Sequence, residues 1–348
     1  MNKVTFYFIV LITTVTLFSC QKDDPIAEIT PPRAYADQYK TDFADIEEYL
    51  NSYYITVINN PGKPDDQDVT ITKIPDGGTQ RSIMSYKDNV FVGSTVYPQL
   101  WSRVVKLHDV DYKLYYLVLR PGIGESPCNV DGVFTSYRGD YLQRIAATTT
   151  APVVPSYISA TKFDENKFPQ SFFSLLNVVR GWSEMFPLFK SGTYSVNNND
   201  GTVSYKDFGA GVLFIPSGLG YYSSVSNSIP GYAPLVFSFK LYDVFRSDTD
   251  GDGVDNYQED LNKDGFMWSY TNTILYPTTS DYPDDATRYA DDYDRDGIPN
   301  FLDKDDDGDN YSTASEIKNP ATGSAYPFAD IPTCTSGKKN YLDITCHP

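Results

Sequence analysis

Carboxylates recur at every second position in the last third of the chain, a spacing that lets their oxygens converge on one cation. Residues 248–259 read DTDGDGVDNYQE, and residues 292–303 read DYDRDGIPNFLD. In a twelve-residue loop of this form, carboxylates occupy positions 1, 3, 5 and 12, a backbone carbonyl serves at position 7, and glycine at position 6 permits a sharp turn. Ca²⁺ takes six to eight such oxygens. The predicted ligands are Asp248, Asp250, Asp252, Val254 and Glu259 in the first loop and Asp292, Asp294, Asp296, Ile298 and Asp303 in the second.

A third frame of the same length spans residues 305–316. It has Asn310 at the turn, a residue type that tolerates the left-handed backbone conformation. A further stretch, residues 260–265, repeats the first half of the pattern and lacks the last ligand. The third frame adds the predicted ligands Asp305, Asp307, Asp309 and Glu316.

An acidic, solvated stalk is the alternative interpretation of these residues. Such a stalk would need neither the turn residue at position 6 nor a carboxylate at position 12, so the pattern favours calcium. The tail is similar to thrombospondin type 3 and dockerin-like repeats, which carry EF-hand-like loops without complete flanking helices. Without metal, we expect its carboxylates to repel one another and the tail to expand. With structural Ca²⁺ we expect a compact tail, at extracellular affinities of about 10⁻⁴–10⁻³ M.

Charge is concentrated in the same part of the chain. The last 104 of the 348 residues contain 20 Asp and 2 Glu against 8 Lys and Arg, which gives −14 of the total net charge of −18. This asymmetry is typical of a separate module. The overall charge disfavours a nucleic-acid partner, because phosphate binding needs clustered cations. With only His108 and His347 present, a His-rich zinc centre and His-based acid/base catalysis are disfavoured as well.

Aromatic residues and strand-like runs dominate the middle of the chain. The sequence contains 29 Tyr and 20 Phe, which favours β-rich structure or an aromatic-lined cleft. Strand signals are densest from residue 112 to 244, and residues 171–182 predict a strand that runs into a turn and a short helix. The sequence therefore predicts an α+β fold.

Five motifs in this region resemble those of FKBP-type peptidyl-prolyl cis-trans isomerases and follow that family's order over about 130 residues. The resemblance implies an antiparallel sheet wrapped on one short helix. The motifs are DGVFTSYRG at 131–139, FD at 163–164, FSL followed by VVRGWSEM at 173–185, FIPSGLGY at 214–221, and IP followed by PLVFSFKL at 229–241.

The reaction of that family explains why an apolar pocket is needed. Rotation about an X–Pro bond breaks amide resonance against a barrier of about 18–20 kcal/mol and takes tens to hundreds of seconds unaided. A dry pocket favours the twisted, less polar amide, so neither nucleophile, general base nor catalytic cofactor is required. The resemblance implies a floor at Trp182, with Val179 also donating its N–H to a substrate carbonyl, Tyr221 donating its hydroxyl, and Asp164 beside the twisted carbonyl. The implied walls are Tyr137, Phe163, Val178, Val179 and Phe237.

Three departures from the family pattern bear on activity. The segment from Gly139 to Phe163 is longer than the family's hairpin, so a loop there could extend or block the cleft. Tyr222 stands where the family has glycine, and Phe168 and Phe172 are both candidates for a further aromatic wall. We expect an isomerase acting on proline-containing segments of exported or surface proteins. The alternative is a non-catalytic surface lipoprotein that binds proline-containing segments.

The N-terminus predicts export and lipid anchoring. Residues 1–19 form a signal sequence whose apolar run is too short to span a membrane. The LFSC stretch at 17–20 resembles a bacterial lipobox, which makes Cys20 the lipidated residue and the membrane a partner. An ordinary signal peptide that contains a cysteine is the alternative. The following QKDD at 21–24 resembles a surface-export signal, so we expect an outer-membrane lipoprotein on the periplasmic or cell-surface side.

The remaining predictions concern organisation. Apolar residues at Tyr39, Phe43, Ile46 and Leu50 predict an amphipathic helix over residues 34–53. In an oxidising compartment, Cys334 and Cys346 could form a disulfide, which leaves Cys128 as a lone thiol. The predicted parts are a signal peptide at 1–19, a tether at 20–33, an N-terminal extension at 34–110, an FKBP-like domain at 111–245 and a calcium-repeat tail at 246–348.

Overall fold

The computed structural model describes residues 31–88, 90–91, 94–226, 228–271, 276 and 282–347. The chain divides into two units, Met1–Arg33 and Ala34–Pro348, and the second is described here. The predicted signal peptide, Cys20 and most of the tether lie outside the described residues. None of the described helices combines the length and the hydropathy that crossing a bilayer requires.

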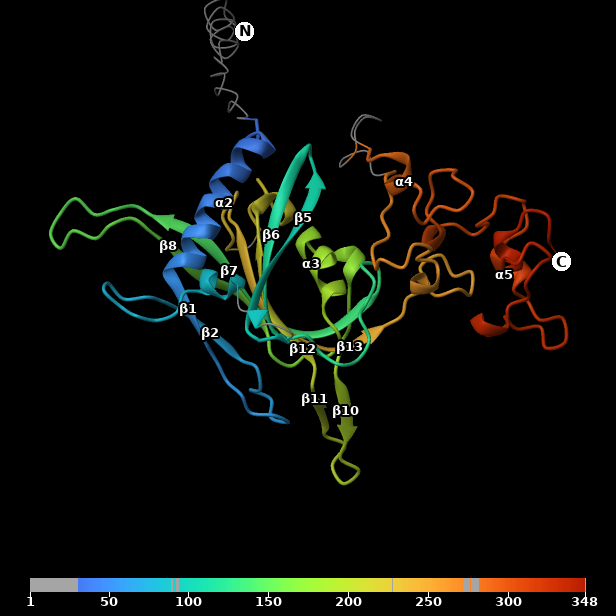
Figure 1. The fold of residues 1–348 in the computed structure, drawn as a ribbon, viewed down its shortest axis with the longest axis horizontal. Coiled ribbons are helices and arrows are strands. Elements are labelled where there is room, and N and C mark those ends of the chain that lie inside the picture. Colours follow the sequence, from blue (N-terminus) through green and yellow to red (C-terminus); the bar gives the residue numbers. More distant parts are fainter. Residues whose placement is uncertain are drawn as a thin grey trace, which may run out of the picture. The chain divides into compact units, whose positions relative to one another are not determined.

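A curled antiparallel half-barrel sheet forms the body of this mostly β structure, which contains few helices (Figure 1). Six strands pair in the order β5-β6-β12-β13-β7-β8, and β9 pairs with the start of β7. Strand β5 falls within the predicted N-terminal extension yet forms one edge of this sheet. The strands are β5 (Gln99–Leu107), β6 (Val110–Arg120), β7 (Gly132–Ile145), β8 (Tyr157–Asn166), β9 (Phe173–Ser174), β12 (Gly209–Ile215) and β13 (Leu235–Phe245).

Every residue of β12 is buried, because both faces of the sheet are covered at this strand. Successive side chains of a strand point to opposite faces. Leu213 and Ile215 accordingly belong to one hydrophobic core, and Val212 and Phe214 to the other.

The short helix α3 (Arg180–Met185) packs in the first of these cores, with Trp182 and Met185 buried there. A Cβ at Gly181 would lie 2.6 Å from the Ile215 side chain. Glycine is therefore required at this position, because any larger residue would push the helix away from β12. The close approach brings Trp182 under the sheet.

The long helix α2 (Tyr35–Ser52) covers the other face, as Figure 1 shows. It confirms the helix predicted over 34–53, with Ile46 and Leu50 buried in the second core. Tyr39 and Phe43 are only half-buried, whereas the polar Gln38 and Asp42 are buried on the same helix.

The long segment between Gly139 and Phe163 is a hairpin extension rather than a bulging loop. Pairing of β7 with β8 continues to Ile145 and Tyr157. The extension is tied to α2, because Arg144 forms ion pairs with Asp45 (2.6 Å) and Glu48 (2.7 Å). The added residues therefore extend the sheet beside α2.

Smaller elements complete the unit. Two further hairpins and a two-stranded pair flank the main sheet, and the tail consists mostly of turns with single-turn helices. The strands are β1 (Tyr53–Val57), β2 (Val69–Lys73), β3 (Val90–Phe91), β4 (Ser94–Thr95), β10 (Thr193–Val196) and β11 (Val203–Lys206). The short helices are η1 (Ile83–Asp88), η2 (Leu175–Asn177), η3 (Phe186–Leu188), η4 (Ser217–Leu219), η5 (Asn256–Gln258), α4 (Asp285–Arg288), η7 (Asn300–Leu302), α5 (Thr313–Glu316), η8 (Phe328–Asp330) and η9 (Asn340–Leu342).

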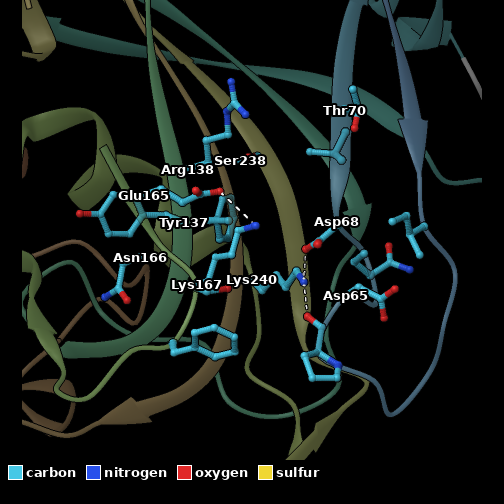
Figure 2. Close-up of a pocket in the computed structure, with 17 residues that line it drawn as sticks. Asp65, Asp68, Thr70, Tyr137, Arg138, Glu165, Asn166, Lys167, Ser238 and Lys240 are labelled. Carbon is cyan, nitrogen blue, oxygen red and sulfur yellow. Dashed lines mark hydrogen bonds and ion pairs between the residues drawn. The ribbon is translucent and has the colours of Figure 1, made fainter. Parts of the chain in front are cut away.

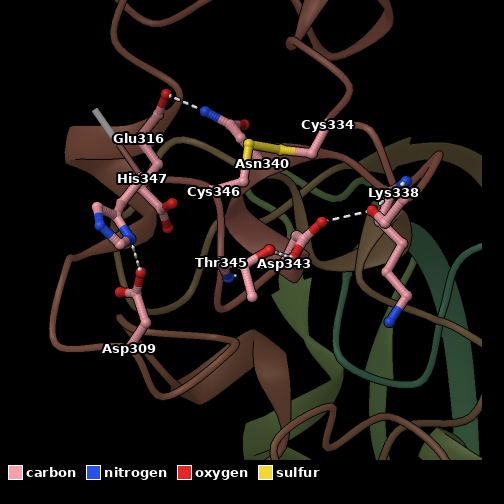
Figure 3. The surroundings of a disulfide bond; sticks show 10 residues. Asp309, Glu316, Cys334, Lys338, Asn340, Asp343, Thr345, Cys346 and His347 are labelled. Atoms are coloured by element: carbon pink, nitrogen blue, oxygen red, sulfur yellow. Dashed lines mark hydrogen bonds and ion pairs between the residues drawn. A yellow bond between two sulfur atoms is a disulfide. The ribbon is translucent and has the colours of Figure 1, made fainter.

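A disulfide joins Cys334 to Cys346, as the sequence suggested (Figure 3). Among the described residues, Cys128 is a buried free thiol. The closed segment lies against the third acidic frame, since Asn340 Nδ2 donates to the Glu316 carbonyl at 2.5 Å. His347 Nδ1 lies 3.0 Å from the Asp309 carboxylate. The C-terminal segment is thereby fixed beside two of the predicted calcium ligands.

The buried carboxylate of Asp42 links α2 to the segment that leads to Tyr221. It accepts hydrogen bonds from the Ser217 N–H (2.8 Å) and hydroxyl (2.6 Å), and from Gln38 Nε2 (2.6 Å). Burial raises the pKa of Asp42. Since Ser217 begins η4, which precedes Tyr221, α2 holds that segment in place.

We expect Asp42→Ala to lower the free energy of unfolding by about 2 kcal/mol, because it leaves the Ser217 donors buried without an acceptor. Urea denaturation would measure this change. Asp37→Ala is the matched control, since Asp37 is an exposed acid of the same helix whose carboxylate pairs with exposed Lys40. Equal, small effects of the two substitutions would contradict the assigned role of Asp42.

Candidate functional site

One pocket of about 870 Å³ collects all eight residues that the FKBP resemblance singled out. They come from β7, β8, the turn before α3, α3 itself, the segment after η4, and β13. The eight are Tyr137, Phe163, Asp164, Val178, Val179, Trp182, Tyr221 and Phe237. Their convergence on one cavity is observed, while their catalytic roles stay predictions.

Trp182 is fixed by surrounding rings. Its centroid lies 5.2 Å from those of Tyr137 and Phe237, both edge-to-face, and 5.0 Å from that of Phe186. The residue is only 4% exposed. Its indole Nε1 is buried without a hydrogen-bond partner among the described residues, so a donor remains free beside the apolar floor.

The walls are aromatic and closely packed. The rings of Phe163 and Phe237 meet edge-to-face at 5.6 Å. A Cβ at Gly139 would lie 2.6 Å from Phe163 and 2.9 Å from Phe237. Glycine at this position of β7 therefore lets the two rings approach each other.

Polar groups lie at the edge of this apolar surface. The Tyr137 hydroxyl donates to Asp164 Oδ2 at 2.5 Å, and burial together with this bond raises the pKa of Tyr137. Burial, and secondly Asp164, raises the pKa of Tyr221, which is 37% exposed. Within the described part of the chain, the Val179 N–H donates to no group. The pocket thus offers hydrogen-bond donors next to an aromatic interior.

The further aromatic wall is Phe173, so the prediction of Phe168 or Phe172 was wrong. Phe173 lines the pocket and lies 6.0 Å from Trp182. Phe168 is 70% exposed, and Phe172 packs instead against Phe134 at 5.3 Å. Strand β9 pairs with β7 and turns Phe173 inward, and spacing alone could not reveal this pairing.

Tyr222 does not line the pocket. It adopts the left-handed backbone conformation (φ 49°) that glycine favours, at a position where the family has glycine. Its ring stacks on Tyr35 of α2 at 4.0 Å, and Tyr35 stacks in turn on His108 at 3.7 Å. The side chain that could have closed the cleft therefore packs against α2.

The rest of the pocket wall comes from the acidic tail, which the motifs did not predict. No twelve-residue frame indicates which surface it will face, so the sequence carried no signal for this contact. The tail contributes Met267, Trp268, Ser269, Phe301 and Leu302 to the lining of the pocket. The other lining residues outside the motif set are Asn129, Ser183, Gly220 and residues around α3.

Asn129 fastens this tail segment beside the pocket. Its Oδ1 accepts the Met267 N–H at 2.8 Å, its Nδ2 donates to the Met267 carbonyl at 2.7 Å, and its N–H donates to the Gly265 carbonyl at 3.0 Å. Met267 and Phe301 share a small core with Cys128 and Val130.

Two arginines of the sheet region stack on aromatic rings of the same segment. The Arg180 guanidinium lies 3.2 Å from the ring centroid of Trp268, and that of Arg103 lies 3.6 Å from the centroid of Phe266. Both arginines also pair with Glu184. The tail is thus held to the pocket region by hydrogen bonds, apolar packing and cation–π contacts.

The acidic loops share one hydrogen-bond scheme. In each, the position-6 N–H donates to the position-1 carboxylate: Gly253 to Asp248 (3.1 Å), Gly265 to Asp260 (2.8 Å), Gly297 to Asp292 (2.9 Å) and Asn310 to Asp305 (2.9 Å). These four position-6 residues have positive φ, as do the residues at position 4. The 260–265 stretch therefore folds like the complete loops.

Side chains at positions 1, 3 and 5 converge in each complete loop. Their ligand atoms lie within 4.8 Å of one another in the sets Asp248, Asp250, Asp252; Asp292, Asp294, Asp296; and Asp305, Asp307, Asp309. Among the position-12 residues, Glu259 has a carboxylate oxygen within 4.8 Å of those of Asp252 and Asp306. Burial, and then the loop carboxylates, raises the pKa of Glu316 to about 8 and that of Asp303 above its usual value.

Two carboxylates near these loops were not predicted. Asp306, from the third loop, is 1% exposed and joins Asp252 and Glu259 in one buried group. Burial and then Asp306 raise the pKa of Glu259 to about 11. Asp291 accepts the Leu261 N–H at 2.9 Å and lies beside the 260–265 stretch, and burial and then Asp260 raise its pKa to about 7. Both residues depend on contacts between loops, which a single frame cannot encode.

The donor set fits a hard divalent cation. Buried carboxylate oxygens without a partner among the described residues occur on Asp250, Asp252, Glu259, Asp306, Asp307 and Glu316. Unpaired buried charge is costly, and all-oxygen coordination suits Ca²⁺.

A second pocket, of about 400 Å³, lies between the β1–β2 hairpin region and strands β7 and β13 (Figure 2). Its buried Lys240 donates to the Pro64 carbonyl at 2.9 Å and pairs with Asp68. Lys167 pairs with Glu165 at 3.7 Å. Both lysines therefore have partners, and the contacts of Lys240 fasten the β1–β2 hairpin region to β13.

Comparison with known proteins gives two partial likenesses. Residues 249–341 match the family model of the BamM C-terminal domain. No curated protein matches the chain significantly.

Solved structures of FKBP-type isomerases resemble part of the chain, at low TM-scores. A peptidyl-prolyl cis-trans isomerase from Pseudomonas syringae is 23% identical (TM-score 0.27), and the match covers 41% of this chain and 81% of that one. FkpA from Escherichia coli is 27% identical (0.26), covering 38% and 48%. The N-terminal domain of FKBP42 from Arabidopsis thaliana is 17% identical (0.28), covering 43% and 98%.

We expect Asn129→Ala to lower the free energy of unfolding by about 3 kcal/mol, because it leaves the N–H and carbonyl of buried Met267 unpaired. Denaturant unfolding would measure the loss, and limited proteolysis should show faster cleavage within residues 260–271. Asn51→Ala serves as the control, since exposed Asn51 donates a hydrogen bond to the Glu47 carbonyl of its own helix. Unchanged proteolysis of the variant would refute the fastening role.

Proposed function

We propose that the chain is a peptidyl-prolyl cis-trans isomerase that acts on exported or surface proteins. The observation that carries this proposal is the convergence of eight motif residues around one aromatic pocket of about 870 Å³. The hairpin extension packs beside α2 and Tyr222 stacks on Tyr35. Neither of these two departures from the family pattern therefore fills the pocket.

Each group has a physical task in this proposal. Trp182, Phe163 and Phe237 surround the prolyl ring and exclude water, which favours the twisted amide because it has lost its resonance polarity. Tyr221 and the Val179 N–H donate to substrate carbonyls and fix the chain on either side of the rotating bond. Asp164, held by Tyr137, lies beside the twisting carbonyl.

We further propose an outer-membrane lipoprotein context. The signal sequence and Cys20 support lipid anchoring. The likeness of residues 249–341 to the BamM C-terminal domain supports association with outer-membrane assembly machinery. Unfolded exported chains would then be the source of proline-containing substrates.

We also propose that the three complete acidic loops bind structural Ca²⁺. Asp248, Asp250, Asp252, Glu259 and the carbonyl of Val254 would hold the first ion, with Asp306 beside them. Partnerless buried oxygens on Asp252, Glu259 and Asp306 support this assignment. Bound calcium would neutralise carboxylates that otherwise repel one another.

The isomerase proposal predicts that the Ala34–Pro348 unit accelerates cis/trans exchange of an X–Pro test peptide. Trp182→Ala and Asp164→Ala should each lower kcat/KM by about tenfold or more, which corresponds to a loss of about 1.4 kcal/mol or more of transition-state stabilisation. Trp101→Ala is the control, because this tryptophan of β5 is 42% exposed and lies outside the pocket. Peptide binding without any acceleration by the unsubstituted protein would leave only a binding module.

The calcium proposal predicts that a chelator lowers the thermal unfolding midpoint and that Ca²⁺ restores it. At a calcium concentration of about 100 times Kd, each ion should contribute roughly 2.7 kcal/mol. Isothermal titration should show Glu259→Gln losing one binding event, while Asp285→Asn, an exposed acid of α4 outside every loop, keeps them all. No heat of binding and no change in the midpoint would eliminate the metal.

A further inference from the structure

The pocket has a second apolar wall that the isomerase motifs do not supply. It is made by Trp268, Phe301 and Leu302 of the tail, which line the same cavity as Trp182. Leu302 is 38% exposed, and Leu176 on the neighbouring rim is 44% exposed. Solvent-facing apolar side chains at the mouth of a pocket provide surface that a ligand can bury.

The tail wall is built from parts of the acidic loops. Phe301 and Leu302 occupy positions 10 and 11 of the second loop, directly before the position-12 carboxylate of Asp303. The Asn300 side chain accepts the N–H of Tyr293, at position 2 of that loop, at 2.9 Å. The residue directly before these two wall residues is therefore hydrogen-bonded within the second loop.

Trp268 is connected to the same loop through Asp291. The Asp291 carboxylate accepts the Leu261 N–H at 2.9 Å, and its backbone carbonyl accepts the Asn300 N–H at 2.7 Å. Leu261 belongs to the 260–265 stretch, which leads through Phe266 and Met267 to Trp268. One residue thus joins the two chain segments that form the wall.

The indole of Trp268 is held in place from the isomerase side. Arg180 stacks over it at 3.2 Å, and the same guanidinium pairs with Glu184 at 2.8 Å. Among the described lining residues, the charged ones are Arg180 and Asp164. The carboxylates predicted to bind calcium therefore do not line the pocket. The wall presents an aromatic and aliphatic surface to a substrate.

We propose that Trp268, Phe301 and Leu302 form a calcium-dependent subsite that binds an apolar side chain next to the substrate proline. The proposal rests on the proposed isomerase function and on the proposed calcium binding of the second loop, and it names the regulation and the substrate class of the isomerase site. Calcium in the second loop keeps the wall assembled. When calcium is removed, repulsion among Asp292, Asp294 and Asp296 separates the wall from the sheet, while the floor and walls supplied by β7, β8, α3 and β13 persist.

Fluorescence anisotropy of two labelled peptides, one Leu-Pro and one Gly-Pro, tests the subsite on the Ala34–Pro348 unit. With saturating calcium, the Leu-Pro peptide should bind about tenfold more tightly, as expected for burial of one apolar side chain. Excess chelator should remove this preference and change Gly-Pro binding less than about twofold. Trp268→Ala should remove the preference in calcium, whereas Trp101→Ala should keep it.

A matched pair of variants separates the second loop from the acidic surface of the tail. Asp294→Asn alters position 3 of the second loop and should abolish the leucine preference. Asp285→Asn removes an exposed acid of α4, outside every loop and outside the described lining of the pocket, and should preserve the preference.

A leucine preference that is unchanged by chelator would overturn the proposal, as would an equal loss of both peptides, which would report collapse of the whole pocket. If neither peptide binds in calcium, the proposed isomerase site fails and the subsite fails with it. That pattern differs from binding of both peptides with no calcium dependence, which overturns the subsite alone.

Discussion

Burial of β12 on both faces is the constraint on which the rest of the structure depends. Leu213 and Ile215 meet the α3 side, where Gly181 allows the helix to approach closely. Val212 and Phe214 meet the α2 side. The same strand continues into Ser217 and Tyr221, so the pocket donor is positioned by residues that α2 binds. The two layers and the site are therefore determined together by one short strand.

Much of the pocket could be predicted because the motif residues belong to neighbouring strands and one helix. Phe163 and Phe237 converge across the sheet. Trp182 lies under the sheet because the preceding glycine, Gly181, lets α3 pack closely against β12. Spacing also predicted α2, although it missed Asp42, whose carboxylate interrupts the apolar stripe and finds its partner 175 residues away. Phe173 was overlooked because its orientation depends on the pairing of β9 with β7.

Contacts between modules could not be predicted from the sequence for a related reason. Each acidic frame predicts its own ligands, since the scheme of backbone donors is local. Asp306 belongs to the third loop but lies in a buried group with Asp252 and Glu259 of the first, and Asp291 precedes the second loop but binds the 260–265 stretch. Trp268 and Leu302 line a pocket made by residues far away in the chain. Local chemistry can be read from spacing, whereas long-range pairing depends on how the loops pack.

The stack of Tyr222, Tyr35 and His108 has a consequence for acidity. Burial, and secondly the positive charge of Arg180, lowers the pKa of His108 to about 4. The folded protein keeps this imidazole neutral, while the unfolded chain takes up a proton near pH 6.5. Acidification from pH 6.5 towards 4 therefore favours unfolding through this residue. The stack of Tyr222, Tyr35 and His108, which joins α2 to the segment that contains Tyr221, stabilises the fold most at neutral and alkaline pH.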